Sequence, residues 1–402
     1  MTGPALALIV RSGLDLNGPG LLAIGLFRAF REQGIPCAMI LGEASDGALR
    51  SLYGQGATEG DLLFLEQLSH GFSPIDLLRP SVAARIAAFL SVFTDSFHGG
   101  KSVCDDGPAF SGRGTAVLGL NHRSALLMWA FHRLGFFRFH GDHFRNLASF
   151  RFFSLAVGKG GEYLFPLFPI PISAVSPSQA AWIRQRGGRV DAVIGNGIIN
   201  SSEIAPLIRE RQRLRKSLRR EMGWGENAFV ACCLSSHFPV KGTMRIPEVA
   251  AGCPGLHIIA AGSGPLSNQV NGRADELGLG SRYRMIPATE QRLEILAGAD
   301  IFLHLPHDET FCIAVTEAMA LGVVPVVSPV GALPGMIQPG VNGYLTEGNP
   351  IDSAVKRISG LMTHEGRNRL KQMAHAASSM AVNRFRDSYT IFRYLQAMGF
   401  YS

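Results

Sequence analysis

Two glutamates, Glu309 and Glu317, stand eight positions apart in an otherwise apolar stretch, HDETFCIAVTEAMALGVVPVVSP. Glu309 comes just before an apolar helical pattern, and Glu317 lies about two turns into it. Eight residues of helix span at most ~12 Å, roughly the reach from a hexose, past two phosphates, to a nucleoside ribose. Carboxylates accept hydrogen bonds from sugar hydroxyls, so this spacing suits the two ends of a sugar nucleotide. By spacing alone, two surface glutamates on an amphipathic helix explain the pattern as well.

The residues around the two glutamates resemble glycosyltransferase family 4. That family's signature is Glu, seven residues and Glu, where the second Glu opens an EAMA-x-G-x-PVV segment. Here Glu309 and Glu317 have that spacing, and Glu317 opens EAMALGVVPVV. The resemblance extends through AAGSGPLSNQV, ILAGADIFLHLPHDETF and GALPGMIQPGVNGYL. It covers about Phe229–Leu345, whereas the first half of the chain matches only weakly.

The resemblance implies a GT-B fold, in which two Rossmann-like, doubly wound parallel-sheet domains face a central cleft. The second domain would hold most of a nucleotide-diphospho-sugar. Glu317 would bind the ribose, and Glu309 would contact the hydroxyls of the donor sugar. The backbone N–H groups of Phe311, Cys312 and Ile313 would bind the diphosphate, because a helix N-terminus is a ready anion site. The implied enzyme is a retaining, hexosyltransferase-like transferase whose sugar nucleotide is a co-substrate rather than a cofactor.

The segment CCLSSHFPVKGT is the place where the family carries Arg and, about five residues later, Lys-Gly. Lys241 and Gly242 match, and the arginine position falls on Ser236, or on Ser235 if the loop is one residue longer. The two cations neutralise the leaving diphosphate, which is a main electrostatic contribution to such a transfer. Arg245 could compensate for the missing arginine, or the chain could be a non-catalytic relative. A solvated surface lysine is the plainer reading of Lys241.

The first half of the chain offers two further candidate groups. Gly18 and Gly20 of NGPG stand where the family has a glycine loop after its first strand, and glycine lets backbone approach a phosphate closely. A plain tight turn is the alternative. In FFRFHGDHF, His140 aligns with a family histidine beside the donor, where imidazole could donate to developing charge. His122 and His143 are rivals for that role.

No metal ion and no cofactor are expected. None of the fourteen aspartates falls in an Asp-x-Asp pattern, which transferases of the other common fold use to hold a metal on the donor. Lys241 and helix N–H groups can neutralise the diphosphate instead. The six cysteines are scattered without a C-x-x-C pair, so buried, reduced thiols in a cytosolic protein are the default.

The segment Phe131–Phe153 holds eight Phe, four Arg, three His and one acidic residue. It could lie on an anionic membrane, stack on bases, or fill a core or an acceptor groove. No nucleic-acid motif accompanies it, so no nucleic-acid partner is expected. Because the chain also carries a net charge of +7, we expect weak attachment to the cytoplasmic face of a membrane. The basic residues of the segment are Arg133, Arg138, Arg145 and Arg151.

The elements that must position these groups follow from composition and periodicity. The chain has 402 residues, 47% of them hydrophobic and 17% charged, and its apolar strands recur every 20 to 30 residues with helices between. This pattern predicts parallel sheets covered on both faces. We expect an N-terminal domain over 1–196, a donor domain over 197–380, and a C-terminal helix over 381–402 that crosses back. No apolar run reaches the ~18 residues of a membrane span, so a cytoplasmic protein is expected.

The sequence thus predicts sugar transfer from a nucleotide-diphospho-sugar to an acceptor hydroxyl in glycan or glycolipid assembly. A lipid-linked saccharide is the favoured acceptor, and a soluble small molecule, such as a natural-product aglycone or an aminocyclitol, is the alternative. A GT-B sugar-nucleotide epimerase and a donor-binding pseudoenzyme are further alternatives.

Overall fold

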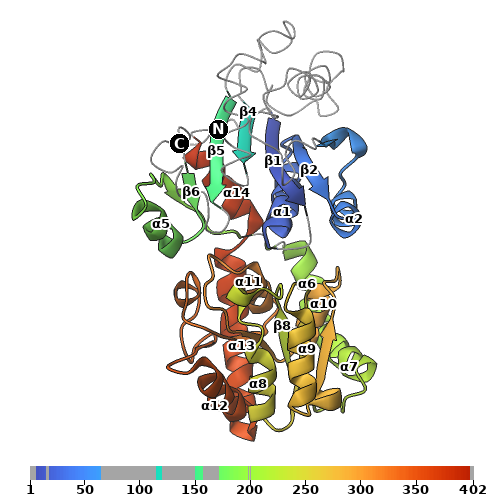
Figure 1. Cartoon of the computed structure of the whole chain (residues 1–402). Helices are drawn as coiled ribbons and strands as arrows, with labels where there is room; N and C mark the ends of the chain where they lie inside the picture. Colours follow the sequence, from blue (N-terminus) through green and yellow to red (C-terminus); the bar gives the residue numbers. More distant parts are fainter. Residues whose placement is uncertain are drawn as a thin grey trace, which may run out of the picture. The chain divides into compact units, whose positions relative to one another are not determined.

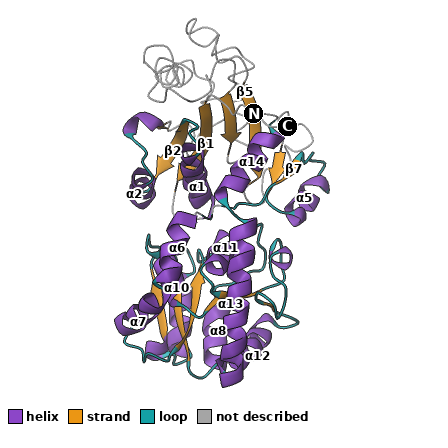
Figure 2. Cartoon of the chain, turned by 180° about the vertical axis from the view of Figure 1, so that it is seen from behind, coloured by secondary structure: helices purple, strands orange, loops and turns teal. Residues whose placement is uncertain are grey.

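The computed structural model describes residues 6–14, 18–64, 115–119, 150–156, 172–197, 199 and 201–398. The chain forms two compact units, shown in Figures 1 and 2. Unit 1 comprises Met1–Gly195 and Ser388–Ser402, and unit 2 comprises Asn196–Asp387. The domain boundary expected at 380/381 falls inside helix α13 (His364–Arg384), which carries the chain on before unit 1 resumes.

Unit 1 contains a seven-stranded sheet in the order β3-β2-β1-β4-β5-β6-β7, and its strand pairs are parallel. Its strands are β1 (Leu6–Leu14), β2 (Cys37–Ala44), β3 (Leu62–Phe64), β4 (Thr115–Gly119), β5 (Phe150–Ala156), β6 (Ile172–Ala174) and β7 (Ala192–Val193). Its described helices are α1 (Gly18–Glu32), α2 (Asp46–Gly54), η1 (Glu59–Asp61), α5 (Pro177–Arg184) and α14 (Asp387–Ala397). Because β1 lies between β2 and β4, the sheet is doubly wound.

Helix α1 packs on β1 and β2 through an apolar face. Ala23, Phe27 and Phe30 lie at i, i+4 and i+7 on this face, and all three are fully buried. Gly34, with φ of 70°, follows the helix, and Pro36 precedes the next strand. The pattern of LLAIGLFRAFREQ predicts a helix over about 21–33, and the helix of the structure starts three residues earlier, at Gly18.

Unit 2 contains a six-stranded parallel sheet in the order β10-β9-β8-β11-β12-β13. Its strands are β8 (Phe229–Leu234), β9 (Leu256–Ala261), β10 (Tyr283–Ile286), β11 (Ile301–His304), β12 (Val324–Val327) and β13 (Tyr344–Leu345). Its helices are α6 (Ser201–Arg209), α7 (Arg211–Glu221), η6 (Pro239–Lys241), α8 (Arg245–Gly252), α9 (Ser267–Glu276), η7 (Gly280–Arg282), α10 (Arg292–Gly298), α11 (Ile313–Ala320), η8 (Leu333–Gly335), α12 (Pro350–Met362) and α13. The strand order reverses between β8 and β11, and ligands of such sheets bind beyond the carboxyl ends of the strands at that point.

Several elements differ from the sequence-based expectation. The charged pattern over 204–222 predicts a single helix, but the structure has two, α6 and α7, which meet at Glu210. Strand β13 was not expected from the sequence. The sequence FFRFHGDH predicts a strand, and RSALLMWAFHRLG just before it predicts a helix; both lie outside the described residues. The end of the Phe131–Phe153 segment forms part of β5, a strand flanked by β4 and β6.

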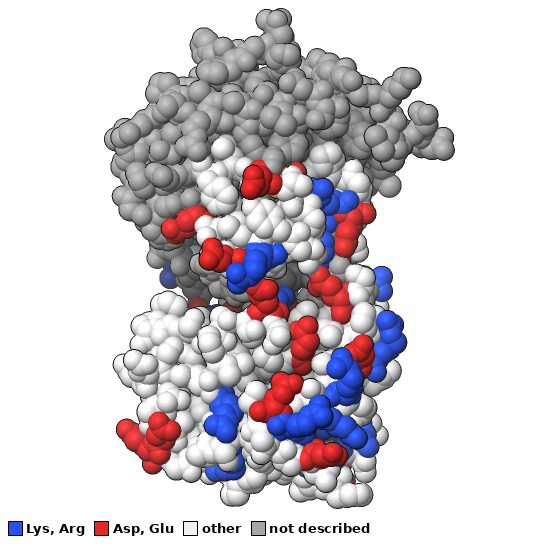
Figure 3. Space-filling model, turned by 90° about the vertical axis from the view of Figure 1, so that its right-hand side faces the viewer, with Lys and Arg blue, Asp and Glu red and all other residues white. Residues whose placement is uncertain are grey.

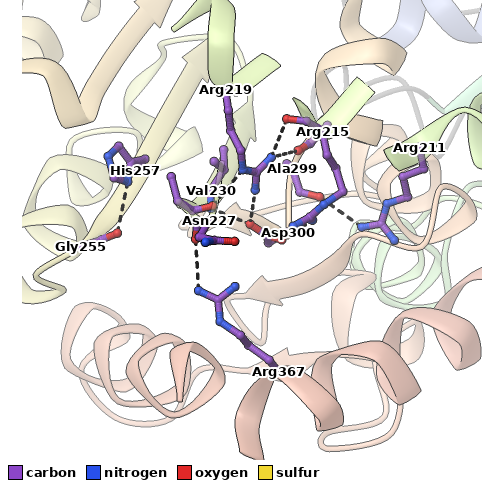
Figure 4. A network of polar contacts seen from close by, with 12 residues as sticks. Arg211, Arg215, Arg219, Asn227, Val230, Gly255, His257, Ala299, Asp300 and Arg367 are labelled. Atoms are coloured by element: carbon purple, nitrogen blue, oxygen red, sulfur yellow. Dashed lines mark hydrogen bonds and ion pairs between the residues drawn. The ribbon is translucent and has the colours of Figure 1, made fainter. Parts of the chain in front are cut away.

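Arginines of α7 fasten this helix to the sheet through Asp300 (Figure 4). The Asp300 carboxylate accepts hydrogen bonds from Arg215 and, at 2.7 Å, from Arg219, and also from the Val230 N–H at 2.8 Å. Arg219 is 1% exposed and donates further to the carbonyls of Ala228, Arg215 and Gly298. Because its donors are satisfied in this way, the buried guanidinium is compensated.

The start and the end of unit 2 lie side by side. The Ile199 N–H donates to the Phe385 carbonyl at 3.1 Å, and the Asp387 N–H donates to the Ile199 carbonyl at 3.3 Å. Unit 2 is therefore a continuous segment inserted into unit 1. Among the described residues, none of the helices combines the length and apolarity needed to cross a membrane.

Candidate functional site

The loop after β8 is joined to the loop after β11 at the point where the strand order reverses. Gly242, just after η6, has φ of 61°, and a Cβ at this position would lie 2.0 Å from the Leu305 carbonyl oxygen. Glycine is therefore required for the close approach of the two loops. The His307 N–H also donates to the Val240 carbonyl at 2.8 Å. Lys241, the last residue of η6, is thereby held against the β11–α11 segment.

Glu309 is the buried carboxylate of this segment, and its Oε2 has two partners. Lys241 donates from Nζ at 2.8 Å, and His304 Nε2 lies 3.0 Å away. The side chains of Glu309 and His304 are 7% and 2% exposed, whereas that of Lys241 is 28% exposed. The Glu309 carbonyl accepts from the Ala332 N–H and leaves no room for a Cβ on Gly331. Both the side chain and the backbone of Glu309 are thus fixed.

Charge pairing dominates the electrostatics of Glu309. Burial opposes its ionised form, but the hydrogen bond with His304 and the charge of Lys241 outweigh burial and lower its pKa to about 2. Burial would lower the pKa of His304, yet interactions with Cys312 and Glu309 raise it to about 9. The pKa of Lys241 is raised because its pairing with Glu309 exceeds the cost of its burial. Glu309 is therefore a carboxylate at neutral pH.

The helix expected to begin at Phe311 begins at Ile313. Phe311 and Cys312 belong to the preceding loop, and Cys312 is the N-cap residue with φ of 77°. It is the only non-glycine residue with positive φ in the described part of the chain. Phe311 is buried against the Phe385 ring, with 5.7 Å between ring centroids. The first turn of α11, whose N–H groups have no partner inside the helix, therefore begins four residues after Glu309.

Glu317 is buried in α11 and paired with a residue that the sequence analysis did not single out. Arg292 of α10 donates to Glu317 Oε1 at 2.9 Å, and the two side chains are 22% and 6% exposed. Burial opposes the charge of Arg292, but Glu317 outweighs it and raises the pKa of Arg292. No spacing pattern in TEQRLEIL marks Arg292, so only the packing of α10 against α11 reveals this pair.

The remaining candidates differ in their positions. Ser236 is half-buried in the loop after β8. Arg245, considered as a substitute for the missing arginine, donates to the Leu305 carbonyl at 2.9 Å and lies 3.0 Å from His307 Nδ1. Gly18 and Gly20 lie in the first turn of α1, at the carboxyl end of β1 in unit 1. The histidine candidates lie outside the described residues; these are His122, His140 and His143.

One group of side chains in the described residues could hold a metal ion. His304, Glu309 and Cys312 each offer one ligand atom, and these atoms lie within 4.8 Å of one another. The sequence analysis did not find this group, because its H-x4-E-x2-C spacing matches no common metal motif.

Comparison with known proteins supports an assignment of the fold. Residues 215–380 match the family model described as glycosyl transferases group 1. The chain is 31% identical over 134 residues to the D-inositol 3-phosphate glycosyltransferase of Mycolicibacterium smegmatis, covering 32% of this chain and 31% of that protein. It is 25% identical over 180 residues to the N-acetyl-alpha-D-glucosaminyl L-malate synthase of Bacillus anthracis, covering 44% and 47%.

Among solved structures, Anabaena HepE in complex with UDP and glucose matches with a TM-score of 0.72 and 17% identity, covering 96% of this chain and 97% of that one. The fold is GT-B, as the sequence predicted. The chain spans about a third of the length of the first curated relatives it matches. Residues 215–380, which match the family model, lie in unit 2.

Proposed function

We propose that this protein is a retaining glycosyltransferase of family 4, which moves a hexose from a nucleotide-diphospho-sugar to an acceptor hydroxyl. The environment of Glu309 carries this proposal. A buried, ionised carboxylate stands in the loop after β11, is paired with Lys241 and lies four residues before the first residue of α11. The match of residues 215–380 to group 1 glycosyltransferases supports the same conclusion.

Each group has a role in this scheme. Glu309 accepts hydrogen bonds from the donor sugar, and its fixed Oε2 leaves Oε1 to face the ligand. Lys241 swings from Glu309 toward the diphosphate as negative charge grows there during cleavage of the glycosidic bond. The backbone N–H groups of Phe311, Cys312 and Ile313 bind the diphosphate, and Glu317 binds the ribose. No metal is assigned to the transfer step.

Retention of configuration follows from a front-side transfer in this proposal. The bond between the anomeric carbon and the phosphate oxygen breaks, and the leaving oxygen accepts the proton of the attacking hydroxyl. The acceptor oxygen forms its bond to the anomeric carbon on the same face that the phosphate leaves. No second carboxylate is needed as a base, and the two glutamates keep binding roles. An NMR coupling constant of the anomeric proton in the product distinguishes retention from inversion.

For the acceptor we propose a lipid-linked saccharide at the cytoplasmic face of a membrane. Three of the four arginines behind this idea, Arg133, Arg138 and Arg145, lie outside the described residues, and Arg151 lies in β5. On the face of the molecule in Figure 3, Lys and Arg side chains are interspersed with Asp and Glu. Because cationic and anionic side chains alternate among the described residues of that face, attachment through them should be weak and sensitive to salt.

The test measures sugar transfer and donor binding separately. Labelled nucleotide sugars are incubated with the protein and with either membrane lipid extract or soluble extract, and binding is measured by calorimetry. Lys241→Ala should lower kcat by about 10²–10³, the loss typical of one transition-state charge contact, with a smaller loss of donor affinity. Lys216→Ala, at an exposed position on α7, is the matched control. Ser236→Arg should keep or raise activity.

Other outcomes identify other functions. Conversion of the donor without an acceptor would indicate an epimerase. Donor binding without any product would indicate a pseudoenzyme, for which the serine at position 236 is the sequence argument. Product in the soluble extract alone would favour a small-molecule acceptor. Unchanged turnover in Lys241→Ala would remove Lys241 from the mechanism.

A further inference from the structure

Three side chains of the β11–α11 segment gather a nitrogen, an oxygen and a sulfur in a small volume. His304 ends β11, Glu309 lies in the loop, and Cys312 is the N-cap residue of α11. Their ligand atoms all lie within 4.8 Å of one another. Two of the three side chains are buried and Cys312 is partly exposed, so a small ion has a route from solvent.

The donor set selects among metal ions by its chemistry. Imidazole, carboxylate and thiolate are the three ligand types that zinc takes in proteins, whereas magnesium and calcium prefer oxygen ligands. Zinc–ligand bonds of about 2.0–2.3 Å place the ligand atoms of a tetrahedral site about 3.3–3.6 Å apart. His304 Nε2 and Glu309 Oε2 are already 3.0 Å apart. Small side-chain movements would therefore close three ligands around one ion and leave a fourth position for water.

Lys241 competes for the same carboxylate oxygen. Its Nζ lies 2.8 Å from Glu309 Oε2, and its side chain is more exposed than those of Glu309 and His304. A dication bound to Oε2 would repel the ammonium group at that distance, and Lys241 can move away into solvent. The ion and the ammonium group of Lys241 therefore cannot bind Glu309 Oε2 at the same time.

We propose that His304, Glu309 and Cys312 bind one Zn²⁺ ion, which displaces Lys241 and occupies the carboxylate assigned to the donor sugar, and so opposes binding of the nucleotide-sugar donor. The second part rests on the proposed function, and the first part does not. The ion binds the deprotonated forms of the three ligands, so any proton that they carry is released to solvent. The site is inhibitory, and it supplies no step of the transfer.

Cobalt is the probe, because a thiolate bound to tetrahedral Co²⁺ gives a charge-transfer absorption band and zinc removes it. The full chain carries Cys104→Ser, since Cys104 lies outside the described residues. We expect a band that saturates at one Co²⁺ per chain and disappears on addition of one Zn²⁺. Calorimetry with Zn²⁺ alone measures the affinity.

The variants separate this site from other thiols and imidazoles. Cys312→Gly removes the sulfur at a backbone conformation that suits glycine, so folding is preserved. Cys312→Gly should abolish the band. His304→Gln should weaken Zn²⁺ binding by at least about tenfold, the loss that even an outer-shell change can cause. Cys253→Ser and His307→Gln are the matched controls and should leave both readouts unchanged. A band that persists in Cys312→Gly, or no band in the parent protein, overturns the site.

A last titration tests the antagonism with the donor. Adding UDP-glucose to the cobalt-loaded protein should reduce the band, and Zn²⁺ should weaken UDP-glucose binding in the parent protein but not in Cys312→Gly. A band that UDP-glucose leaves unchanged, at concentrations where calorimetry shows UDP-glucose bound, overturns the antagonism. Failure of the proposed function would show separately, as absence of sugar transfer in metal-free protein, while the cobalt spectrum would remain.

Discussion

The single hydrogen bond between Arg292 and Glu317 fixes a carboxylate that we assign to the donor ribose. Removing the cation leaves a buried carboxylate that turns or takes up a proton, and either change removes the ribose contact. Arg292→Gln should therefore weaken nucleotide binding by about tenfold, which is about 1.4 kcal/mol. Arg292→Lys should restore part of the loss.

Calorimetry with the nucleotide alone measures this effect without any transfer reaction. Arg284→Gln, which changes an exposed arginine of β10, is the matched control. Equal affinity in Arg292→Gln and in the parent protein would show that Glu317 is positioned by other groups or does not bind the ribose.

Cys312 allows a second prediction at the scale of one residue, because its φ of 77° is unfavourable for a side chain. A left-handed conformation costs roughly 1–2 kcal/mol, and the greater freedom of an unfolded glycine offsets about 0.5–1 kcal/mol of the gain. Cys312→Gly should leave the free energy of unfolding unchanged or raise it by up to about 1 kcal/mol. Cys312→Val should lower it, because a branched side chain fits this conformation worst.

Urea denaturation of the two variants, followed by circular dichroism, checks the order Gly, Cys, Val. If Cys312→Gly were the least stable of the three, contacts of the sulfur would outweigh the backbone preference.

At the scale of one element, the attachment of α7 depends on Asp300. Asp300→Ala leaves the buried guanidinium of Arg219 without its counter-charge, which typically costs 3–5 kcal/mol, so unfolding should occur at a clearly lower urea concentration. Glu210→Ala removes the exposed carboxylate that pairs with Arg213 in the same helix. This control should change stability by less than about 1 kcal/mol. Similar losses in both variants would mean that the buried pair contributes no more than a surface pair.

The loop after β8 is joined to the start of α9 through His237. Its N–H donates to the Ser263 carbonyl at 2.9 Å, its carbonyl accepts from the Leu266 N–H at 3.0 Å, and its ring Nδ1 lies 2.9 Å from Ser267 Oγ. Burial lowers the pKa of His237. A lowered pKa in the folded state means that the unfolded chain binds the proton more tightly. The neutral His237 side chain therefore contributes to the free energy of unfolding above about pH 6.5, and this contribution is lost on acidification.

The thermal midpoint should accordingly fall between pH 7 and pH 5 by more in the parent protein than in His237→Gln. His257→Gln, at a more exposed histidine, is the comparison. Parallel pH profiles of the parent and His237→Gln would exclude His237 as a source of acid sensitivity.

The sequence predicted helices and strands better than it predicted contacts between side chains. The strands of unit 2 are continuous apolar runs because both faces of a parallel sheet are covered, so β8, β9 and β11 could be recognised without a structure. The break at Glu210 carries no signal, since Arg209 and Arg211 suit a helix interior. His304 and Arg292 were missed because their partners are set by the packing of neighbouring elements. Glu309 and Glu317 were found because they interrupt an apolar pattern.

At the scale of the whole molecule, a bound donor should protect the backbone amides of unit 2 from hydrogen exchange far more than those of unit 1. Bound ligand stabilises by mass action, about 2.7 kcal/mol at 100 times Kd, and the groups assigned to the donor's sugar, diphosphate and ribose all follow strands of unit 2. Hydrogen exchange with saturating nucleotide should slow most in peptides covering 301–320, with little change in peptides covering 37–54. Protection confined to unit 1 would contradict the assignment of the donor to unit 2.

The insertion of unit 2 between two parts of unit 1 sets an order for folding during synthesis. Unit 2 is one continuous segment whose ends meet at Ile199 and Phe385, so its contacts are complete once residue 387 has left the ribosome. Unit 1 begins the chain, yet it lacks α14 until the later residues emerge, and the buried Ile391, Tyr394 and Leu395 belong to that helix. Domains usually complete their folds in order from the N-terminus. Here unit 2 can complete its fold before unit 1, although unit 1 begins earlier in the chain. We therefore expect the residues that pack against Ile391, Tyr394 and Leu395 to stay exposed during translation until α14 emerges.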